Sequence, residues 1–588
     1  MLKKVRQGLG NCPVLLQSGI VFVVALLLAF VHGGIGGLQN DDLQISFMLN
    51  GGGAAPSPFS LYTNVCLGWA LCHLSSIWPG VNWYYCFLCA MAAMASLAIN
   101  YSACERAARC SIAYKIATLL FLVYINYRGM ITIQYTHVGV YAACAAVLLL
   151  SRIFDRGVSV SRLVVSSFLL FAAFCLRTSV LLPAAFLLIG IVVAEWQRLT
   201  EGCILRRFGF AVAVPLLLCG CAFIVNTIEY RNSPEWDNAL RFLQARVQIV
   251  DSKDNSGLNK EADLLNAGIS PESFGLFKKF VYVPEMDNVD TVESALRIHK
   301  KGRKGVLGCS AAADVGLLEF QMSNLKPKNT LARSVTPYTP LGIAVFLLLL
   351  FPERKRLLKA AGMLVAVGSY LCILTLMDRL VGRVLDPLLY ASALYVMSIP
   401  EDSAHVRCWK WRASGAVLLS ALACMFCFRH LKEPSGNANT AWAYCESKPD
   451  TLFFTCSMQF PWATSSKLEA FSLQHLQNTN ILPLADGWIF YTPAYKAALK
   501  ARGVSNPYVR LMQPNAQFIT RKQGSRQSAL QCIQKEIHAQ TGQRVDFEKV
   551  SERGDFEFWT VSTTTPPNPS CPVSDFCPNA QPDAVILK

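Results

Sequence analysis

The sequence predicts a mainly α-helical, polytopic membrane protein with about 11 transmembrane helices and a C-terminal extracytoplasmic α/β domain. Two observations support the membrane part. The 588 residues are 53% hydrophobic and only 16% charged, whereas soluble proteins carry about 25% charged residues. The apolar residues also fall in blocks close to the length that crosses about 30 Å of hydrocarbon as a helix. A third observation, the polar character of the chain from about 430 onward, indicates a domain in water.

The predicted transmembrane helices follow the apolar blocks. The stretch 163–196 is long for one span, and Arg177 interrupts it, so we expect two short helices there. Residues 61–79 are apolar but carry Asn64 and His73, and they either span the membrane or lie along its outer surface. The remaining helices are expected at about 13–33, 82–101, 111–127, 131–151, 208–228, 337–352, 361–377, 385–400 and 414–428.

The charge distribution predicts the orientation. The chain carries 54 Lys and Arg against 38 Asp and Glu, a formal net charge of +16. The basic residues lie mostly in short hinges between apolar blocks, which is where the positive-inside rule places cytoplasmic loops. This placement favours the lipid bilayer as the partner of the basic residues and argues against nucleic acid. The N-terminus is then cytoplasmic and the C-terminal domain extracytoplasmic.

Four regions follow from this topology. Residues 1–228 form an N-terminal transmembrane bundle with a first outer loop at 34–60, and 229–335 form an extracytoplasmic loop. Residues 336–429 hold the last transmembrane helices. Residues 430–588 form the α/β domain, with strands expected at 450–455 and 556–562, helices at 494–502 and 527–541, and a loose end. Outside the cytoplasm, Cys445 with Cys456 and Cys571 with Cys577 could form disulfides.

The first outer loop holds two adjacent carboxylates, Asp41 and Asp42, a few residues beyond the first helix. A carboxylate at that place can act as a general base on a hydroxyl, or hold a divalent metal against phosphate. Equally, one of them could cap a short helix from Leu43 to Leu49 in a solvated loop. The spacing alone leaves both interpretations open.

An acidic residue in the first extracytoplasmic loop resembles the hallmark of the GT-C glycosyltransferases. Further short motifs are similar to multispanning bacterial proteins near that superfamily: Pro58 to Asn64, Trp78 to Tyr84, Gln134-Tyr135-Thr136, and Gly382-Arg383 before Asp386-Pro387. The likeness covers the membrane half of the chain. A His-Pro-Pro element, found in the mannosyltransferase members, is absent from the sequence, which leaves the donor open.

The resemblance implies an enzyme that transfers a sugar from a polyprenyl-phosphate donor to a cell-envelope acceptor. Such a reaction needs a base that takes the proton from the acceptor hydroxyl, and Asp41 or Asp42 is the candidate. It also needs a cation that holds the phosphate as its charge grows, which suits the bidentate geometry of Arg. Whether a divalent cation takes part is left open by the sequence.

Several basic and polar residues are candidates for binding the donor phosphate. Arg177 stands between apolar segments, where an ionisable side chain is costly and often functional, although it could also be a turn residue that reaches the interface. Arg379 could instead pair with Asp378, and His137 could simply be packed in a helix. The full candidate set is Arg128, Gln134, His137, Arg177, Arg379 and Arg383.

Two other functions compete with the enzyme. A transporter or flippase of lipid-linked sugars would usually show inverted repeats with broken helices, and the sequence shows no internal repeat. A non-catalytic envelope assembly protein would rarely need so many spans. A site that joins the acidic pair to arginines at the outer face favours the enzyme, and a cavity through the membrane favours the transporter.

Overall fold

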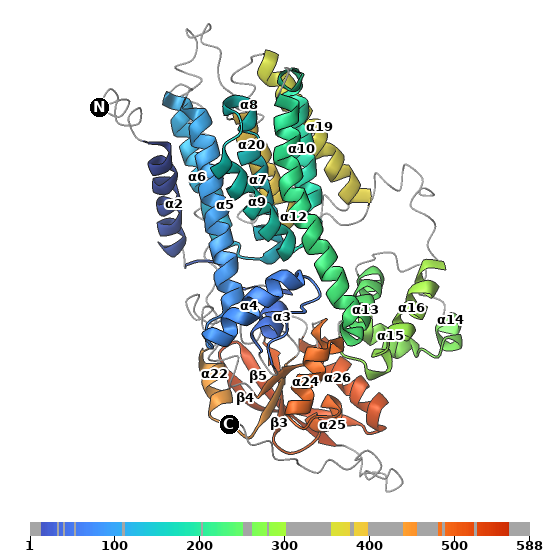
Figure 1. Ribbon diagram of the computed structural model, residues 1–588. Coiled ribbons are helices and arrows are strands. Elements are labelled where there is room, and N and C mark those ends of the chain that lie inside the picture. The colour runs from blue at the N-terminus through green and yellow to red at the C-terminus, as the bar shows by residue number, and fades with distance from the viewer. Residues whose placement is uncertain are drawn as a thin grey trace.

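The computed structural model describes residues 13–563 except 32–33, 39–40, 52–54, 109–111, 201–203, 251–260, 279–280, 302–353, 377–381, 398–438, 456–479, 485–487 and 523–525. Within this part of the chain, long helices form a bundle in one half of the molecule (Figure 1). Shorter helices and a small sheet form the other half (Figure 1). The predicted helices at 337–352 and 414–428 lie outside the described residues.

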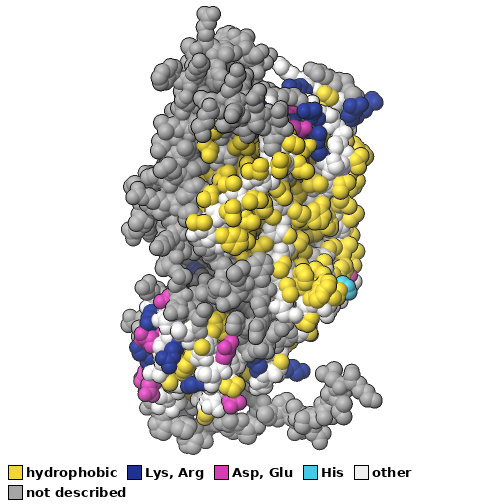
Figure 2. Space-filling view, turned by 90° about the vertical axis from the view of Figure 1, so that its left-hand side faces the viewer, with side chains coloured by type: hydrophobic (Ala, Val, Ile, Leu, Met, Phe, Trp, Pro, Cys, Tyr) yellow, Lys and Arg dark blue, Asp and Glu magenta, His cyan; other side chains and the backbone are white. Residues whose placement is uncertain are grey.

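The bundle is built from helices that match the apolar blocks of the sequence. Four of its segments are long and apolar enough to cross a membrane, namely Val14–Val31, Trp83–Ala107, Tyr135–Arg156 and Ile204–Asn232. Large apolar side chains lie exposed on its surface, and Leu217, for example, is 69% exposed. Figure 2 shows a broad apolar face on one side of the molecule. These features identify a membrane protein. The bundle helices are α2 (Val14–Val31), α5 (Trp83–Ala107), α6 (Ile112–Ile131), α7 (Tyr135–Leu150), α9 (Val160–Leu176), α10 (Leu181–Ala194), α12 (Ile204–Asn232), α19 (Arg354–Leu376) and α20 (Gly382–Met397).

Helix α7 lies at the centre of the bundle. All of its residues are buried, and it contacts α5, α9, α10 and α20. Its middle is rich in alanine, from Ala142 to Ala146, and it carries Gly139 near its start. Small residues let helix backbones approach closely, which is how helices associate in lipid.

Two helix boundaries test the predicted breaks. The stretch 163–196 is divided as predicted: α9 ends at Leu176, Arg177 is extended, and the short helix η1 (Thr178–Val180) leads into α10. The predicted break between the helices at 111–127 and 131–151, at Arg128 and Gly129, is wrong, because α6 continues to Ile131 and the break falls at 132–134. The side chain of Gln134 caps α7 there by accepting from the amide of His137 at 3.1 Å, so α7 starts at Tyr135 rather than near 131.

The first loop forms two short helices against one end of the bundle. Helix α3 (Asp41–Asn50) is buried along nearly its whole length, and α4 (Val65–Ile77) lies beside it across the bundle end (Figure 1). At 13 residues, or about 20 Å, α4 is too short to span about 30 Å of hydrocarbon. Asn82 accepts hydrogen bonds from both Ser46 and Asn50 at 3.1 Å, which fixes α3 to the start of α5.

The long loop continues directly from α12. That helix has 29 residues, or about 44 Å, and so reaches beyond the apolar part of the bundle. The first element of the loop is helix α13 (Pro234–Val250). The other described elements of the loop are α14 (Glu261–Asn266), α15 (Pro271–Lys278), η3 (Pro284–Met286) and α16 (Val289–Lys301).

The C-terminal domain is an α/β module, as predicted. Its five strands run in the order β2-β1-β3-β5-β4, with β1 parallel to both β2 and β3, and β5 antiparallel to β3 and β4. The strands are β1 (Leu452–Thr455), β2 (Ile481–Pro483), β3 (Ala516–Arg521), β4 (Val545–Arg553) and β5 (Phe556–Thr563). The helices are α22 (Asn439–Glu446), η7 (Ile489–Tyr491), α24 (Pro493–Ala501), α25 (Pro507–Leu511) and α26 (Arg526–Thr541).

A buried ionic network closes the opposite end of the bundle, where α5 ends. Arg152, at 1% exposure, donates to Glu105 at 2.9 Å and contacts Asp155, which Arg198 reaches at 2.8 Å. Buried ion pairs offset their desolvation only when the geometry is good, and here each carboxylate meets several cations. The network joins α5, α8 (Ile153–Arg156), α9, α11 (Trp196–Leu199), α19 and α20.

Candidate active site

Asp41 and Asp42 occupy the first turn of α3, at the end of the bundle that faces the C-terminal domain. The expected helix from Leu43 starts two residues earlier, so neither carboxylate caps it as proposed. Successive helical residues point about 100° apart, because a turn holds 3.6 residues. The two side chains therefore enter different surroundings.

Asp42 is fully buried and joins three elements. Its Oδ1 accepts from the Tyr84 hydroxyl at 2.7 Å and from the Tyr135 amide at 3.0 Å, so it caps the first turn of α7. Its Oδ2 has no hydrogen-bond partner among the described residues. Burial raises the pKa of Asp42 from its usual 3.8 to about 8, against the lowering effect of these two hydrogen bonds and of the Arg383 charge. Asp42 is therefore mostly neutral at pH 7.

Asp41 is only half-buried, and two side chains from distant segments hold it. The Trp488 indole Nε1 donates to its Oδ1 at 3.1 Å, and the Tyr135 hydroxyl donates to its Oδ2 at 3.3 Å. Tyr62 stands beside both partners, with its ring 4.7 Å from the Trp488 ring and 6.0 Å from the Tyr135 ring. Asp41 thus lies in an aromatic setting at the surface where the bundle meets the C-terminal domain.

Arg177 connects to Asp41 through a hydroxyl. Its Nη1 donates to the Tyr135 hydroxyl at 2.6 Å and to the Thr136 hydroxyl at 2.6 Å, while its Nε donates to Ser179 at 2.9 Å. The guanidinium also lies 5.2 Å from the centre of the Tyr135 ring. The break between α9 and α10 therefore brings a cation to the start of α7, beside the acidic pair.

The charged groups of the site act on the pKa of the Tyr62 hydroxyl. Burial raises the pKa of Tyr62 well above its usual value, and the neighbouring Asp41 and Tyr135 add to the rise. Arg246 and Arg177 act in the opposite direction on the same hydroxyl. Arg246 belongs to α13, is 2% exposed, and stacks over the rings of Phe277 and Tyr491. The long loop thus brings a further cation close enough to act on Tyr62.

The other predicted residues gather behind Asp42, inside the bundle. Arg128 of α6 lies 3.8 Å from Asp386 of α20, measured from Nη2 to Oδ2. His137 is 2% exposed and stacks on Tyr141, and neither of its ring nitrogens has a hydrogen-bond partner among the described residues. The Gln134 side chain is used as the cap of α7.

The predicted site residues therefore fall into two groups. Asp41 and Arg177 lie at the aromatic surface, whereas Asp42, Gln134 and His137 are buried. Arg128 is half-buried and pairs with Asp386. Arg383 is half-buried near the start of α20, close enough to act on Asp42. Arg379 lies outside the described residues.

Sequence reasoning missed the aromatic partners of Asp41. Tyr135 and Tyr62 stood inside motifs that carried the family resemblance, but the motifs did not say which side chain would meet the carboxylate. Trp488 lies 447 positions from Asp41, and no local pattern connects the two. Arg246 belongs to the long loop and was not among the predicted site residues.

The described residues show neither a metal-binding group nor a disulfide at the candidate positions. Among them, no group of three or more His, Cys, Asp or Glu side chains is arranged to hold a metal ion. Cys445 is buried and forms no disulfide within the described part of the chain, and Cys456, Cys571 and Cys577 lie outside that part.

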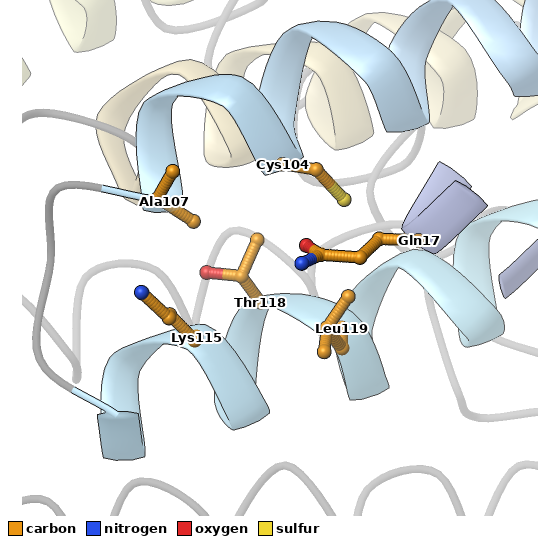
Figure 3. A pocket seen from close by; sticks show the side chains of 7 residues that line it. Gln17, Cys104, Ala107, Lys115, Thr118 and Leu119 are labelled. Atoms are coloured by element: carbon orange, nitrogen blue, oxygen red, sulfur yellow. The ribbon is translucent and has the colours of Figure 1, made fainter. Parts of the chain in front are cut away.

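A small pocket lies at the far end of α5 from Asp42, between α2, α5 and α6. Figure 3 shows Gln17, Thr118 and Lys115 around it, with Cys104 and Leu119 beside them. Helix α5 has 25 residues, so about 36 Å separate its two ends. The pocket is therefore no part of the Asp41 site.

Comparison with models of known protein families and with curated proteins found no match. Among solved structures, the chain is similar to the crystal structure of ArnT from Cupriavidus metallidurans in the apo state. The TM-score is 0.38 at 12% sequence identity, over 93% of this chain and 97% of that chain. A likeness at this level is too weak to establish a shared fold or activity.

Proposed function

We propose that this chain is a GT-C-like glycosyltransferase that moves a sugar from a polyprenyl-phosphate donor to a cell-envelope glycan or lipid on the outer face of the membrane. The observation that carries the proposal is the chain of contacts from Arg177 through Tyr135 to Asp41. It joins a cation to a half-buried carboxylate at one end of an apolar bundle. The resemblance of the first loop to that of GT-C enzymes supports the same reaction.

Asp41, rather than Asp42, is the base in this proposal. A carboxylate offers about four lone-pair positions, and the hydrogen bonds from Trp488 and Tyr135 use two of them. The other positions can accept the proton of an acceptor hydroxyl. Asp42 is 0% exposed and already caps α7, so it has no surface for an acceptor to touch.

Arg177 and Arg383 are the proposed phosphate-binding cations. Arg177 is half-buried, and among the described residues its Nη2 group makes no hydrogen bond, so two N–H donors are left for an anion. Arg383 reaches the same region from α20. A divalent cation beside the phosphate would be an additional partner, and the half-buried Asp41 is a carboxylate that could ligate it.

The atoms of the transfer balance without a further reactant. The acceptor oxygen forms a bond to the anomeric carbon of the sugar as its proton passes to Asp41. The bond from that carbon to the phosphate oxygen breaks, and polyprenyl phosphate leaves with the electron pair. Arginine stabilises the charge that grows on the phosphate, a role that fixed cations perform well where water is excluded.

The proposed orientation places Asp41 outside the cytoplasm. The opposite end of the bundle holds Arg106, Arg152, Arg156, Arg162 and Arg198 within the described residues. The positive-inside rule assigns such an end to the cytoplasm. The first loop, the long loop and the C-terminal domain would then all be extracytoplasmic.

A transfer assay with Asp41→Asn and Asp42→Asn tests the proposal. The donors are decaprenyl phosphates that carry a tritiated hexose or pentose, and the acceptors are those present in envelope membranes that contain the protein. Loss of a general base typically costs about 10²- to 10⁴-fold in rate, which we expect for Asp41→Asn. We expect Asp42→Asn to stay within about tenfold of the wild type, because the amide oxygen can still accept the two hydrogen bonds of Asp42.

The outcomes of this assay test both the role of Asp41 and the proposal that the protein is an enzyme. Full transfer by Asp41→Asn at a normal protein level would remove the catalytic assignment. A wild-type protein that transfers no sugar from any of these donors would contradict the enzyme and favour a transporter or an assembly protein.

A further inference from the structure

The C-terminal domain inserts one side chain into the site of the membrane bundle. Trp488 follows β2 and precedes η7, and its side chain is 5% exposed. Its indole Nε1 donates to Asp41 at 3.1 Å, and its ring packs edge-on against Tyr62, with an interplanar angle of 84°. A residue of the C-terminal domain thus donates to one oxygen of the proposed base.

The backbone around Trp488 is anchored independently of the indole. Gln44 lies one turn after Asp41 on α3 and is 3% exposed. Its Oε1 accepts from the amides of Trp488 and Ile489, both at 3.0 Å. On the other side, the Tyr491 hydroxyl accepts from the Val283 amide at 3.2 Å, and its ring stacks on Phe242 at 4.2 Å. The segment is therefore clamped between the first loop and the long loop.

We propose that Trp488 is a positioning residue for Asp41, and that the C-terminal domain completes the site by presenting it. This inference rests on the proposed function, in which Asp41 is the base. Trp488 donates to Oδ1 and Tyr135 donates to Oδ2, so each oxygen of the carboxylate is held by a hydrogen bond. Fixing a base in this way keeps its free lone pairs directed to one place, where the acceptor hydroxyl must lie.

The role of the Trp488 indole can be tested separately from that of Gln44, which holds the backbone of Trp488 and Ile489. Trp488→Phe keeps an aromatic ring against Tyr62 but removes the N–H donor. A hydrogen bond to a charged group is stronger than a neutral one, and its loss should lower kcat by about 10- to 100-fold. The KM for the lipid-linked donor should stay unchanged, because among the described residues Trp488 forms no hydrogen bond and no ring contact with Arg177 or Arg383. The acidic limb of the pH–rate profile should move to higher pH, since the ionised carboxylate loses a donor.

Trp559 supplies a matched control in the same domain. It is also buried, at 7% exposure, and its indole Nε1 donates to Thr520 at 2.9 Å within the sheet. Trp559→Phe removes the same type of donor from the same type of side chain without touching Asp41. Any loss of kcat in Trp559→Phe measures general damage to the domain and is subtracted from the effect of Trp488→Phe.

A second measurement does not depend on turnover. Hydrogen–deuterium exchange of the detergent-purified protein reports on the peptide that spans α3. We expect faster exchange there in Trp488→Phe than in the wild type, and no change in Trp559→Phe. Gln44→Met, which removes the acceptor for both backbone amides but retains a side chain of similar length, should also accelerate exchange in α3 and lower kcat.

The two readouts separate failure of this inference from failure of the proposed function. A Trp488→Phe protein with wild-type kcat and an unshifted pH–rate profile would overturn the positioning role, as would unchanged exchange in α3. If the wild-type protein transfers no sugar, the enzyme proposal fails, and exchange in α3 still decides whether Trp488 holds the Asp41 segment. If Trp488→Phe does not fold, Gln44→Met provides the same comparison.

Discussion

At the scale of single residues, two adjacent aspartates show how far local surroundings can separate identical side chains. Asp41 is half-buried and faces an aromatic surface, whereas Asp42 is fully buried beneath it and caps α7. The difference arises from helix geometry, because the side chains leave α3 about 100° apart. One carboxylate can therefore meet a substrate while its neighbour holds the scaffold in place.

The buried position of Asp42 predicts a specific dependence of stability on pH. Its pKa is raised on folding from 3.8 to about 8, so between these values the folded state binds a proton that the unfolded state has lost. The stability that the neutral carboxyl contributes is thus fully present below about pH 4 and is lost as pH rises towards 8. Asp42→Asn cannot ionise and escapes this loss. We expect its melting temperature to exceed that of the wild type increasingly from pH 5 to pH 8.

Thermal unfolding in detergent across that pH range checks the prediction. Asp287→Asn is a useful comparison, because burial also raises the pKa of that carboxyl but Lys496 contacts it at 3.0 Å and favours its charged form. The pH-dependent gain should therefore be smaller for Asp287→Asn. If the difference in melting temperature between the wild type and Asp42→Asn is the same at every pH, Asp42 is not neutral in the folded protein.

At the scale of elements, the position of the Asp41 loop depends on a close backbone approach. The amide of Gly36 donates to the Met130 carbonyl at 2.9 Å, and its carbonyl accepts from the Tyr85 hydroxyl at 2.7 Å. A Cβ atom at Gly36 would lie 2.2 Å from the backbone oxygen of Ile131. Only glycine lets the chain that leads to α3 pass so near the end of α6.

Gly36→Ala should therefore displace the loop and weaken both fold and activity. Forcing an extra methyl group into a packed site typically costs about 1–3 kcal/mol, which predicts a measurably lower melting temperature and slower sugar transfer. Gly37→Ala is the matched control, since its Cβ would meet nothing within 4 Å. Equal melting temperatures for the two variants would mean that the loop tolerates a shift at Gly36.

Elements were more predictable from the sequence than the contacts between them. Apolar blocks and the charge at Arg177 located the α9–α10 break, because an ionisable residue between apolar segments is costly in lipid. The break before α7 was misplaced, because Arg128 and Gly129 are a stronger local turn signal than 132–134. Two side chains decided its position, Gln134 from the adjoining turn and Asp42 from 93 residues earlier. Long-range caps of this kind leave no local pattern in a sequence.

At the scale of the whole molecule, the two ends of the bundle differ in what they present. One end is closed by the buried network around Arg152 and Glu105, with further arginines at its edge. The other end carries the first loop, the long loop and the C-terminal domain, which meet around Asp41 and Trp488. Figure 2 shows Lys and Arg side chains above the apolar face, at the end away from the C-terminal domain. Because Asp41 lies at only one of these two ends, the orientation of the bundle determines the side of the membrane on which the proposed reaction can occur.

Cysteine labelling of intact cells tests that orientation directly. Ala55 in the first loop and Ser505 in the C-terminal domain are exposed at the Asp41 end, while Arg156 is 50% exposed at the other. We expect a membrane-impermeant maleimide to label Ala55→Cys and Ser505→Cys, and to label Arg156→Cys only after the cells are opened, with labelling of the parent protein subtracted. The proposed reaction uses a lipid-linked sugar outside the cytoplasm, so the reverse pattern would place Asp41 on the wrong side of the membrane. No rearrangement of the site residues could then recover the proposed transfer.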